Sequence, residues 1–391
     1  MTIRPFILPS NTSLTYCLTH AKALINKHTV TPNDNGCQYY LATYLQALGF
    51  TCEHVVIHGV SNLIARWGQG ARHVAFCGHT DVVSPGPLSH WRYPPFEAHI
   101  ENSQLYGRGA ADMKTGLAAM LGACQRVLPG LNQDDFTFWW LITSDEEGDA
   151  QWGSKWIKQV LDERGVHLDM CLIGEPTASS ATGDTIKIGR RGALSGTIDV
   201  AGKQGHVAYP HSCDNAIHRA SRIVQGLLDL GWDGGDLDFP GTSLQITHID
   251  SGTFTDNIAP GKCQIEFNVR FDATYTLTTL KAAVLERVLS ADNDATIRWS
   301  RPCEAYQSHA REGDCLIAMA EAAIYRATGR YPLLSTSGGT SDGRFFATEE
   351  TQVVELGVPN TTIHQINESI HLSDLLTLED IYADMLVQLA R

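Results

Sequence analysis

The sequence has little positive charge. Lysine and arginine total 29 against 43 aspartates and glutamates, which gives a formal net charge of −14 at pH 7. No basic run or stripe interrupts this pattern, whereas a nucleic-acid-binding face needs one. The composition therefore excludes nucleic acid as a partner. An anionic small molecule can still bind such a chain through a few local arginines.

Long apolar runs and paired cysteines are missing as well. No stretch approaches the roughly 18 consecutive apolar residues of a membrane-spanning helix, so we expect no membrane contact. The ten cysteines include no C-x-x-C pair, and the first residues lack the charged-then-apolar pattern of a secretory signal. We therefore expect reduced thiols in a cytoplasmic protein.

The chain does contain enough apolar material for a large core. Its 391 residues are 43% hydrophobic and 18% charged, which is typical of a soluble protein with two domains. Apolar spacing predicts helices at 13–27, 34–48, 113–128, 152–163, 313–328 and 376–390, and strands at 55–65, 73–78, 136–143, 170–173 and 352–356. This alternation favours an α/β domain with a mixed, largely parallel sheet covered by helices.

The pattern changes after Arg191. The apolar spacing there predicts strands at 193–201, 243–250, 262–272 and 295–299, and helices at 214–230 and 276–290. This β-α-β-β-α-β order is that of a ferredoxin-like α+β domain. We therefore expect a discontinuous catalytic domain, residues 1–191 and 304–391, with a smaller domain, residues 192–303, inserted into it.

Imidazoles and carboxylates gather where the predicted strands of the larger domain end. His79 and Asp81 follow the apolar run that starts at Val74, and open α/β sheets bind their ligands at that end of a strand. The other candidates stand beside a glycine or at the end of an apolar run: Asp112, Glu146, Glu147, Glu175 and His364. A two-metal hydrolytic site needs such ligands from several elements, together with a general base.

The charge of this set favours metal ions. Asp112, Glu147 and Glu175 together would carry −3, and two like charges about 4 Å apart repel by roughly 4 kcal/mol at an effective dielectric constant of ~20. Two divalent cations would supply +4, and a bridging hydroxide would bring the total to zero. Adjacent glutamates point in different directions, so one can bind metal while Glu146 moves the proton of a water molecule whose pKa the metal lowers. Asp81 suits the task of orienting the metal-binding imidazole.

Each of these residues also has an ordinary structural explanation. A histidine after a strand is more often structural than metal-binding, and the acidic loop around Glu146 suits the start of a helix. Asp112 could cap the helix predicted after it, and Glu175 could lie in a turn before Pro176. Five potential ligands at the ends of elements are nevertheless hard to obtain by chance, so we favour the metal site.

Eight short motifs resemble those of the dinuclear zinc aminoacylase/carboxypeptidase family. They are, in order, G-H-T-D-V-V, Y-G-R-G-A-A-D-M-K, L-I-T-S-D-E-E, I-G-E-P, G-R-R-G, G-H-V-A-Y-P-H, G-G-T-S-D-G-R-F and T-I-H-Q-I-N-E. The resemblance spans about residues 30–385. The second, sixth and seventh motifs point to the branch that hydrolyses the succinyl amide of a diamino diacid in lysine and peptidoglycan-precursor synthesis.

The resemblance implies two zinc ions per subunit, although carboxylate and imidazole sites also accept Co²⁺ or Mn²⁺. Asp112 would bridge the two ions. His79 and Glu175 would bind one of them, and Glu147 and His364 would bind the other. The family fold implies the same discontinuous catalytic domain with an inserted dimerisation domain.

The resemblance also assigns residues to catalysis and to substrate binding. Glu146 would be the general acid/base, and Asp81 would support His79. The inserted domain would form a homodimer interface and send His206 into the other subunit's active site to stabilise the oxyanion, although His211 could compete for this role. Residues that match substrate-binding positions are Arg190, Tyr209, Asn257, Arg270, Gly339, Thr340 and Asn360. Guanidinium groups suit the carboxylates of an anionic N-acyl amino acid.

Other functions stay open on the residues alone. The same metals and general base serve acetylornithine deacetylases, aminoacylases and carboxypeptidases, which differ in what the arginines recognise. Residues 339–343 also fit the serine-hydrolase pattern G-x-S-x-G around Ser341, with His364 and His371 downstream, but the stretch before it is short and polar for the strand that this turn needs. A non-catalytic metal-binding protein would be expected to lack Glu146 or a ligand, and this chain has them all.

Overall fold

The computed structural model describes residues 10–236, 239–252, 255–308 and 315–390, and the chain divides into two compact units. Unit 1 comprises Met1–Gly189, Ser308–Ser335 and Ser341–Arg391, and unit 2 comprises Arg190–Gln307 and Thr336–Thr340. Within the described ranges, no helix combines the length and the apolar character that crossing a membrane requires.

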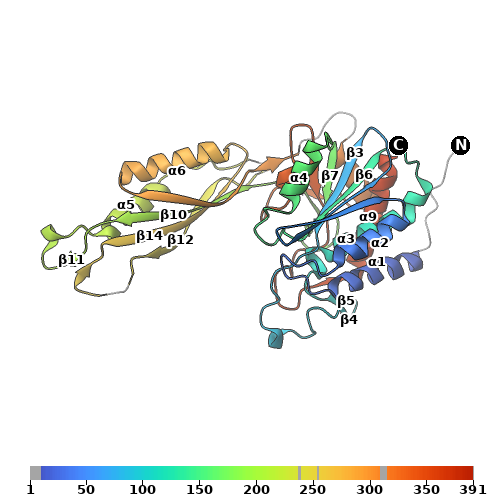
Figure 1. The fold of residues 1–391 in the computed structure, drawn as a ribbon, viewed down its shortest axis with the longest axis horizontal. Coiled ribbons are helices and arrows are strands. Elements are labelled where there is room, and N and C mark those ends of the chain that lie inside the picture. Colours follow the sequence, from blue (N-terminus) through green and yellow to red (C-terminus); the bar gives the residue numbers. More distant parts are fainter. Residues whose placement is uncertain (1–9, 237–238, 253–254, 309–314, 391) are drawn as a thin grey trace. The chain divides into compact units, whose positions relative to one another are not determined.

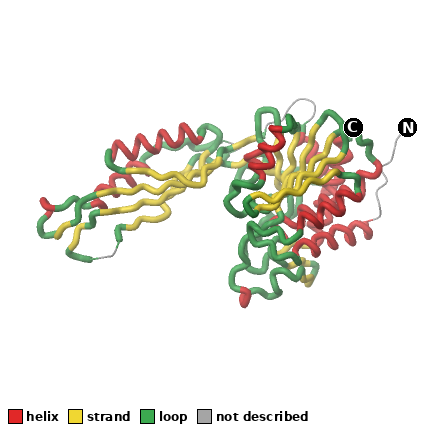
Figure 2. Tube along the Cα trace, in the orientation of Figure 1, coloured by secondary structure: helices red, strands yellow, loops and turns green. Residues whose placement is uncertain are grey.

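A mixed sheet forms the centre of unit 1 (Figures 1 and 2). Its strands are, in spatial order, β1 (Thr51–Ile57), β2 (Val60–Trp67), β6 (Thr137–Thr143), β3 (His73–His79), β7 (Met170–Ile173), β18 (Gln352–Glu355), β8 (Thr185–Lys187) and β17 (Leu333–Ser335). β6, β3, β7 and β18 run parallel to one another, whereas β2 is antiparallel to both β1 and β6, and β8 is antiparallel to β18. β6 is buried along its whole length, as a strand covered on both faces must be. This confirms the predicted α/β class.

Helices cover both faces of this sheet (Figure 1). One face packs on α1 (Ser10–Ile25), α2 (Cys37–Ala47), α3 (Thr115–Val127), α7 (Leu316–Thr328) and α9 (Leu372–Leu389), which share one apolar core with the strands. The other face packs on α4 (Ser154–Glu163) and α8 (Gly343–Phe346). The helix predicted at 313–328 is observed as α7, and positions 313 and 314 lie outside the described residues.

The single strand predicted at 55–65 is wrong, because the chain forms a hairpin there. β1 ends at Ile57 and pairs directly with Val60, the first residue of β2. The turn consists of His58 and Gly59, both with positive φ (50° and 85°). Tight two-residue hairpin turns require this left-handed conformation. Histidine is not one of the residues that usually mark such a turn, so the apolar run on either side obscured it.

A second, three-stranded sheet in unit 1 was not predicted. Its strands are, in spatial order, β19 (Ser369–His371), β5 (Gln104–Tyr106) and β4 (His99–Glu101). Each has only three residues, which is too short for an alternating pattern to be recognised. Ser369 pairs with Tyr106, so the chain just before β19 is aligned with the chain just after β5. This alignment matters for the metal centre.

Unit 2 is a four-stranded antiparallel sheet with two helices on one face (Figures 1 and 2). The strand order is β12 (Ser243–Asp250), β14 (Lys262–Phe271), β10 (Gly192–Ala201) and β15 (Thr296–Cys303), and the helices are α5 (Ala216–Leu228) and α6 (Leu277–Ala291). Alternate residues of β14, such as Ile265, Phe267 and Val269, are buried beneath the helices. The element order β-α-β-β-α-β is the predicted one.

Two short strand pairs and the segment Thr336–Thr340 complete unit 2. β11 (Gly205–His206) pairs with β13 (Ile258–Ala259), and β9 (Gly189–Arg190) pairs with β16 (Tyr306–Gln307). The predicted boundaries placed residues 336–340 in the catalytic domain, but in the structure they group with unit 2. The reason is that Ser337 accepts a hydrogen bond from Arg190, and the Thr340 hydroxyl lies 2.9 Å from the Cys303 thiol.

Candidate metal centre

Three parallel strands bring the predicted ligands to one edge of the unit 1 sheet. His79 is the last residue of β3 and lies opposite Thr143, the last residue of β6. Glu146 and Glu147 follow β6, and Glu175 follows β7, which pairs with β3 on its other side. The carboxyl ends of parallel strands meet at a common edge, which is where α/β sheets bind ligands.

Asp112 reaches the same edge because α3 approaches the sheet closely. A Cβ atom on Gly116, in the first turn of α3, would lie 2.5 Å from the carbonyl oxygen of Gly174. Only glycine allows this approach of helix to strand end. Asp112 lies in the buried turn Ala110–Lys114 that leads into α3, and the N-cap of α3 is Lys114 rather than Asp112. The carboxylate is instead directed at the histidines.

The Asp112 carboxylate lies between two imidazoles. Its Oδ1 is 3.1 Å from Nε2 of His79, and its Oδ2 is 3.4 Å from Nε2 of His364. His79 Nε2 is also 3.5 Å from Oε1 of Glu175, and His364 Nε2 is 3.0 Å from Oε1 of Glu147. Each imidazole thus faces one carboxylate of its own and shares Asp112 with the other. This is the arrangement of two adjoining cation sites with a common bridging ligand.

The pKa values show that the centre is short of positive charge. Hydrogen bonds to Asp112 and Glu147 raise the pKa of His364 to about 10. Burial lowers the pKa of His79, but hydrogen bonds to Asp112 and Glu175 outweigh it and raise this pKa well above its usual value. Burial and the charge of Asp112 raise the pKa of Glu175 to about 7. Protons are held where cations would bind, so two imidazoles and three carboxylates fit two divalent ions.

The His79 ring is oriented through its second nitrogen. Nδ1 lies 2.9 Å from the main-chain oxygen of Asp81, to which it donates because a carbonyl only accepts. The Asp81 carboxylate lies further off, 3.6 Å from Nδ1. It accepts the main-chain N–H groups of Glu146 (3.4 Å) and Glu147 (3.1 Å). Asp81 therefore also holds the loop that carries Glu146 and Glu147 (the glutamate loop) at the end of β3. The sequence did not suggest this contact.

The two adjacent glutamates face different partners. Glu147 contacts His364, whereas ligand atoms of Glu146 lie with those of His79 and Glu175 within 4.8 Å of one another. Burial, followed by the charge of Glu175, raises the pKa of Glu146 well above its usual value. A carboxyl group whose pKa is raised beside a candidate metal site suits general acid/base catalysis.

Glu368 lies beside the centre, although sequence analysis assigned it no role. It is 1% exposed, and its carboxylate accepts main-chain N–H groups from the turn that carries Asp112. It is the last residue of the T-I-H-Q-I-N-E motif. A glutamate next to a three-residue strand carries no chemical signal of its own, because its function depends on the folded main chain around it.

The structure does not favour the serine-hydrolase alternative. Ser341 is 1% exposed, and its hydroxyl donates to the carboxylate of Glu355. The two candidate histidines are engaged elsewhere: His364 faces the metal centre, and Nδ1 of His371 lies 2.7 Å from the Ser373 hydroxyl. The strand that precedes the motif, β17, has three residues at the sheet edge. G-x-S-x-G here is a sequence coincidence.

Arg270 in unit 2 is held on the sheet face that the helices leave open. It lies on β14 opposite Ala193, and its Nε donates to Oδ1 of Asn268 at 3.1 Å. Nδ2 of Asn268 donates in turn to the Ser195 hydroxyl at 2.9 Å. Burial and the nearby charge of Arg191 lower the pKa of Arg270. Among the described residues, neither guanidinium has a carboxylate within ion-pair distance, so this pair is suited to an anionic ligand.

The other predicted substrate residues fall into both units. Arg190 donates to the main chain of Ser337 at 3.0 Å, beside Gly339 and Thr340 on the 336–340 segment of unit 2. Asn360 lies in unit 1, where its N–H donates to Ala178 at 2.9 Å, three residues beyond Glu175. Arg190 is buried on β9, whereas Gly339 is exposed and Thr340 and Asn360 are partly exposed.

His206, Tyr209 and Asn257 are brought together in unit 2 by the β11–β13 pair. His206 pairs with Ile258, and Val207 donates its N–H to the Asn257 carbonyl at 3.0 Å. The His206 and Tyr209 rings lie 5.8 Å apart, and Tyr209 is 68% exposed. His211 follows in an exposed turn. These side chains form an exposed aromatic and polar group on unit 2.

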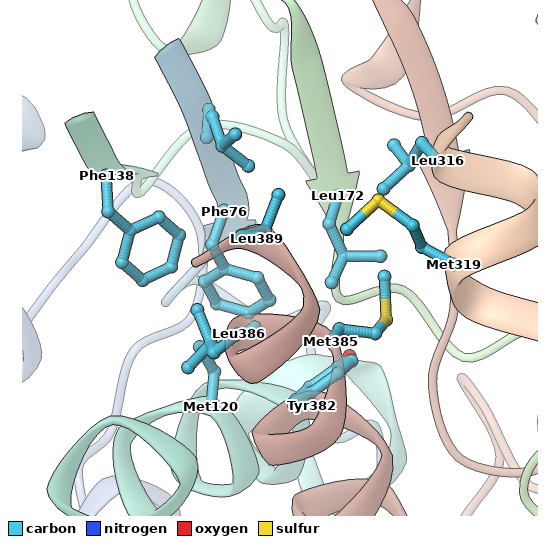
Figure 3. A pocket seen from close by; sticks show the side chains of 12 residues that line it. Phe76, Met120, Phe138, Leu172, Leu316, Met319, Tyr382, Met385, Leu386 and Leu389 are labelled. Atoms are coloured by element: carbon cyan, nitrogen blue, oxygen red, sulfur yellow. The ribbon is translucent and has the colours of Figure 1, made fainter. Parts of the chain in front are cut away.

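An apolar cavity in unit 1 is separate from this chemistry (Figure 3). It lies between the sheet and the helices and is lined by side chains such as Phe76, Leu172 and Tyr382. Its volume is about 20 Å³, room for roughly one water molecule. It is a packing defect of the core and too small for a substrate.

The chain belongs to peptidase family M20/M25/M40, whose family model matches residues 75–388. Succinyl-diaminopimelate desuccinylase 1 of Alteromonas mediterranea is 59% identical over 373 residues, covering 95% of this chain and 96% of that protein. Succinyl-diaminopimelate desuccinylase 2 of Shewanella loihica is 46% identical over 374 residues, covering 94% and 99%.

Solved structures share the fold at low sequence identity. An M20 family metallo-carboxypeptidase of Sulfolobus solfataricus superposes with a TM-score of 0.78 at 16% identity, covering 96% of this chain and 99% of that one. The aminopeptidase PepT of Bacillus cereus superposes with a TM-score of 0.79 at 20% identity, covering 97% and 99%. These structures extend the likeness to both units of the chain.

Proposed function

We propose that this protein is a metal-dependent amidohydrolase that removes succinate from N-succinyl-L,L-2,6-diaminopimelate, a step of lysine and peptidoglycan-precursor synthesis. The observation that carries the proposal is the Asp112 carboxylate, held between His79 and His364 with a further carboxylate beside each ring. The names of the relatives that match almost the whole chain support the choice of substrate.

The chemistry is the addition of water across an amide. The water oxygen bonds to the carbonyl carbon and the C–N bond breaks, which gives succinate and a free amine. Divalent cations at the centre would polarise the carbonyl and lower the pKa of the attacking water. Glu146 removes a proton from that water and delivers it to the leaving nitrogen. Its raised pKa lets it hold this proton between the two steps.

The ligand set suits zinc in both positions, and one position could instead hold Co²⁺ or Mn²⁺, because carboxylate and imidazole ligands accept several divalent ions. One ion would be held by His79 and Glu175, the other by Glu147 and His364, with Asp112 shared between them. Asp81 positions His79 and the glutamate loop.

The substrate carries several carboxylates, and unit 2 offers guanidinium groups to bind them. Arg270 is oriented by Asn268 and has no competing acidic partner among the described residues. Arg190, Gly339, Thr340 and Asn360 complete the binding set. We place the enzyme in the cytoplasm, where its ten free cysteines stay reduced.

We also propose a homodimer in which unit 2 of each subunit completes the other subunit's active site. His206 stabilises the oxyanion there, with Tyr209 and Asn257 beside it. Exposure of His206 and Tyr209 beside the β11–β13 pair supports this role, because the His206 side chain makes local contacts there, with the Ala208 N–H and the Tyr209 ring, that leave Tyr209 68% exposed.

Mixing two inactive variants tests the shared site. His206→Ala lacks the oxyanion group, and Glu146→Gln lacks the base. A heterodimer of the two contains one site with both groups intact, so co-refolded equimolar protein should recover about one quarter of wild-type activity in a two-fold symmetric dimer. The measurement is the initial rate of succinate release. A mixture as inactive as its components, with heterodimers verified by mass, would refute the exchange.

Succinate release from N-succinyl-L,L-diaminopimelate by the zinc-loaded protein tests the proposed activity itself. The proposal would be wrong if the folded, zinc-loaded protein released no succinate at every substrate concentration tested.

A further inference from the structure

Glu368 has hydrogen-bond partners on all sides of its buried carboxylate. Oε2 accepts from Nη1 of Arg108 at 2.7 Å and from the N–H of Gly109 at 2.9 Å. Oε1 accepts from the N–H groups of Ala111 at 2.8 Å and Asp112 at 3.0 Å. All four partners are donors, and an ionised carboxylate is the side chain that accepts four hydrogen bonds and donates none. A buried group so fully satisfied fixes the main chain that surrounds it.

The main chain held in this way is the turn that carries the bridging ligand. The carbonyl oxygen of Glu368 also accepts the N–H of Gly107 at 3.0 Å. Pairing of Ser369 with Tyr106 then continues the alignment into the three-stranded sheet. Glu368 therefore contacts the 107–112 segment through both its main chain and its side chain.

The 364–368 segment, which ends in Glu368, also carries the second histidine. His364 lies four residues before Glu368, and its Nε2 is 3.4 Å from Oδ2 of Asp112. The distance between the two ligands thus depends on how the 364–368 segment sits against the 107–112 turn. Glu368 is the side chain that joins them.

Arg108 extends the connection to the loop after β3. It is 2% exposed, its Nη2 donates to the Ser84 carbonyl at 3.3 Å, and its guanidinium lies over the Trp91 ring at 5.3 Å. The Trp91 Nε1 donates to the Pro85 carbonyl at 2.8 Å. The loop after β3 is therefore connected, through Arg108, to the Glu368 carboxylate that also binds the 107–112 segment.

We propose that Glu368 is a positioning residue for the metal centre: it sets the main-chain path through Asp112 so that both carboxylate oxygens face the two histidines. The inference rests on the proposed function only in that the centre holds metal. Glu368 itself does not contact substrate or metal. Its effect reaches the reaction through the bridging ligand.

The test is a calorimetric Zn²⁺ titration of chelator-stripped Glu368→Gln. The amide keeps the shape of the side chain but replaces one acceptor oxygen by a donor, so two of the four donors lose their partner. We expect Zn²⁺ affinity to fall by about 10–100-fold, as for other residues that orient metal ligands. The value of kcat should fall while KM for the substrate stays near that of the wild type, because the substrate-binding residues are unchanged.

Glu101→Gln is the matched control. Glu101 ends β4 in the same small sheet and also pairs with an arginine, Arg92, at 2.6 Å, but it touches neither ligand. Its zinc affinity should equal that of the wild type. Glu368→Asp retains the charge on a side chain one methylene shorter, and should bind zinc more weakly than wild type and more tightly than the glutamine variant.

Wild-type zinc affinity in folded Glu368→Gln would overturn the proposal, even if its thermal stability were lower, because a merely structural residue would behave in that way. If the glutamine variant does not fold, wild-type affinity in Glu368→Asp overturns it equally. The titration needs no substrate. Failure of the proposed activity would therefore appear separately, as a wild-type protein that binds zinc but releases no succinate.

Discussion

Glu146→Gln is expected to reduce kcat by about 10²–10⁴-fold, the usual contribution of a general acid/base. The amide cannot take a proton from water or return one to the leaving nitrogen. Its shape is that of the glutamate, so the carboxylates around His79 and Asp112 keep their places. The measurement is kcat for succinate release together with the zinc content of the same sample.

The control for this prediction is Glu53→Gln, at an exposed position on β1 where the glutamate pairs with Arg164. It should leave both kcat and zinc content unchanged. Near-normal turnover by Glu146→Gln with both metals bound would show that another group moves the proton. Loss of zinc from Glu146→Gln would instead show that Glu146 is a ligand, as its position near Glu175 would allow.

Asp112→Asn should affect both metal positions at once. Each oxygen of the Asp112 carboxylate faces one imidazole, and an amide offers one neutral oxygen and one donor nitrogen, so neither cation keeps its shared anionic ligand. The loss of zinc affinity should exceed the about 10–100-fold caused by losing an orienting residue, and activity should fall to background. Because ligand binding stabilises a protein by about 2.7 kcal/mol at 100 times Kd, the rise in Tm that zinc causes in the wild type should shrink.

Thermal unfolding with and without zinc, combined with a zinc titration, measures this effect. Asp149→Asn is the matched control, because Asp149 is exposed on the loop that follows Glu147. It should show the full zinc-induced rise in Tm. A wild-type response in Asp112→Asn would mean that the two ions do not share this carboxylate.

Several of the candidate metal ligands could be selected from the sequence because they follow recognisable elements. Apolar runs mark β3, β6 and β7, and polar residues directly after such runs must meet at one edge of a parallel sheet. The same reasoning separated unit 2, whose alternating strands and two helices are long enough for periodicity to be read. The geometry then supplied what a pattern cannot, namely that Asp112 lies between His79 and His364.

The parts that sequence reasoning missed depend on contacts between distant segments. Glu368 acts on a turn about 260 residues away along the chain, and nothing in its own neighbourhood indicates that. Asp81 binds the glutamate loop through main-chain N–H groups. Every residue except proline has such a group, so the sequence does not mark the contact. The hairpin at His58–Gly59 was not predicted because histidine stands at the first turn position, where Asn, Asp or Gly would mark such a turn.

A side-by-side assay of the zinc-loaded protein on N-succinyl-L,L-diaminopimelate and N-acetylornithine, with and without chelator, tests the central claim most directly. Our account predicts cleavage of the succinyl substrate alone, and its complete loss when metal is removed. Preference for N-acetylornithine would preserve the metal centre but contradict the proposed substrate. Cleavage of the succinyl substrate after complete removal of metal would contradict the metal-dependent mechanism. Ser341 would then be the next residue to test.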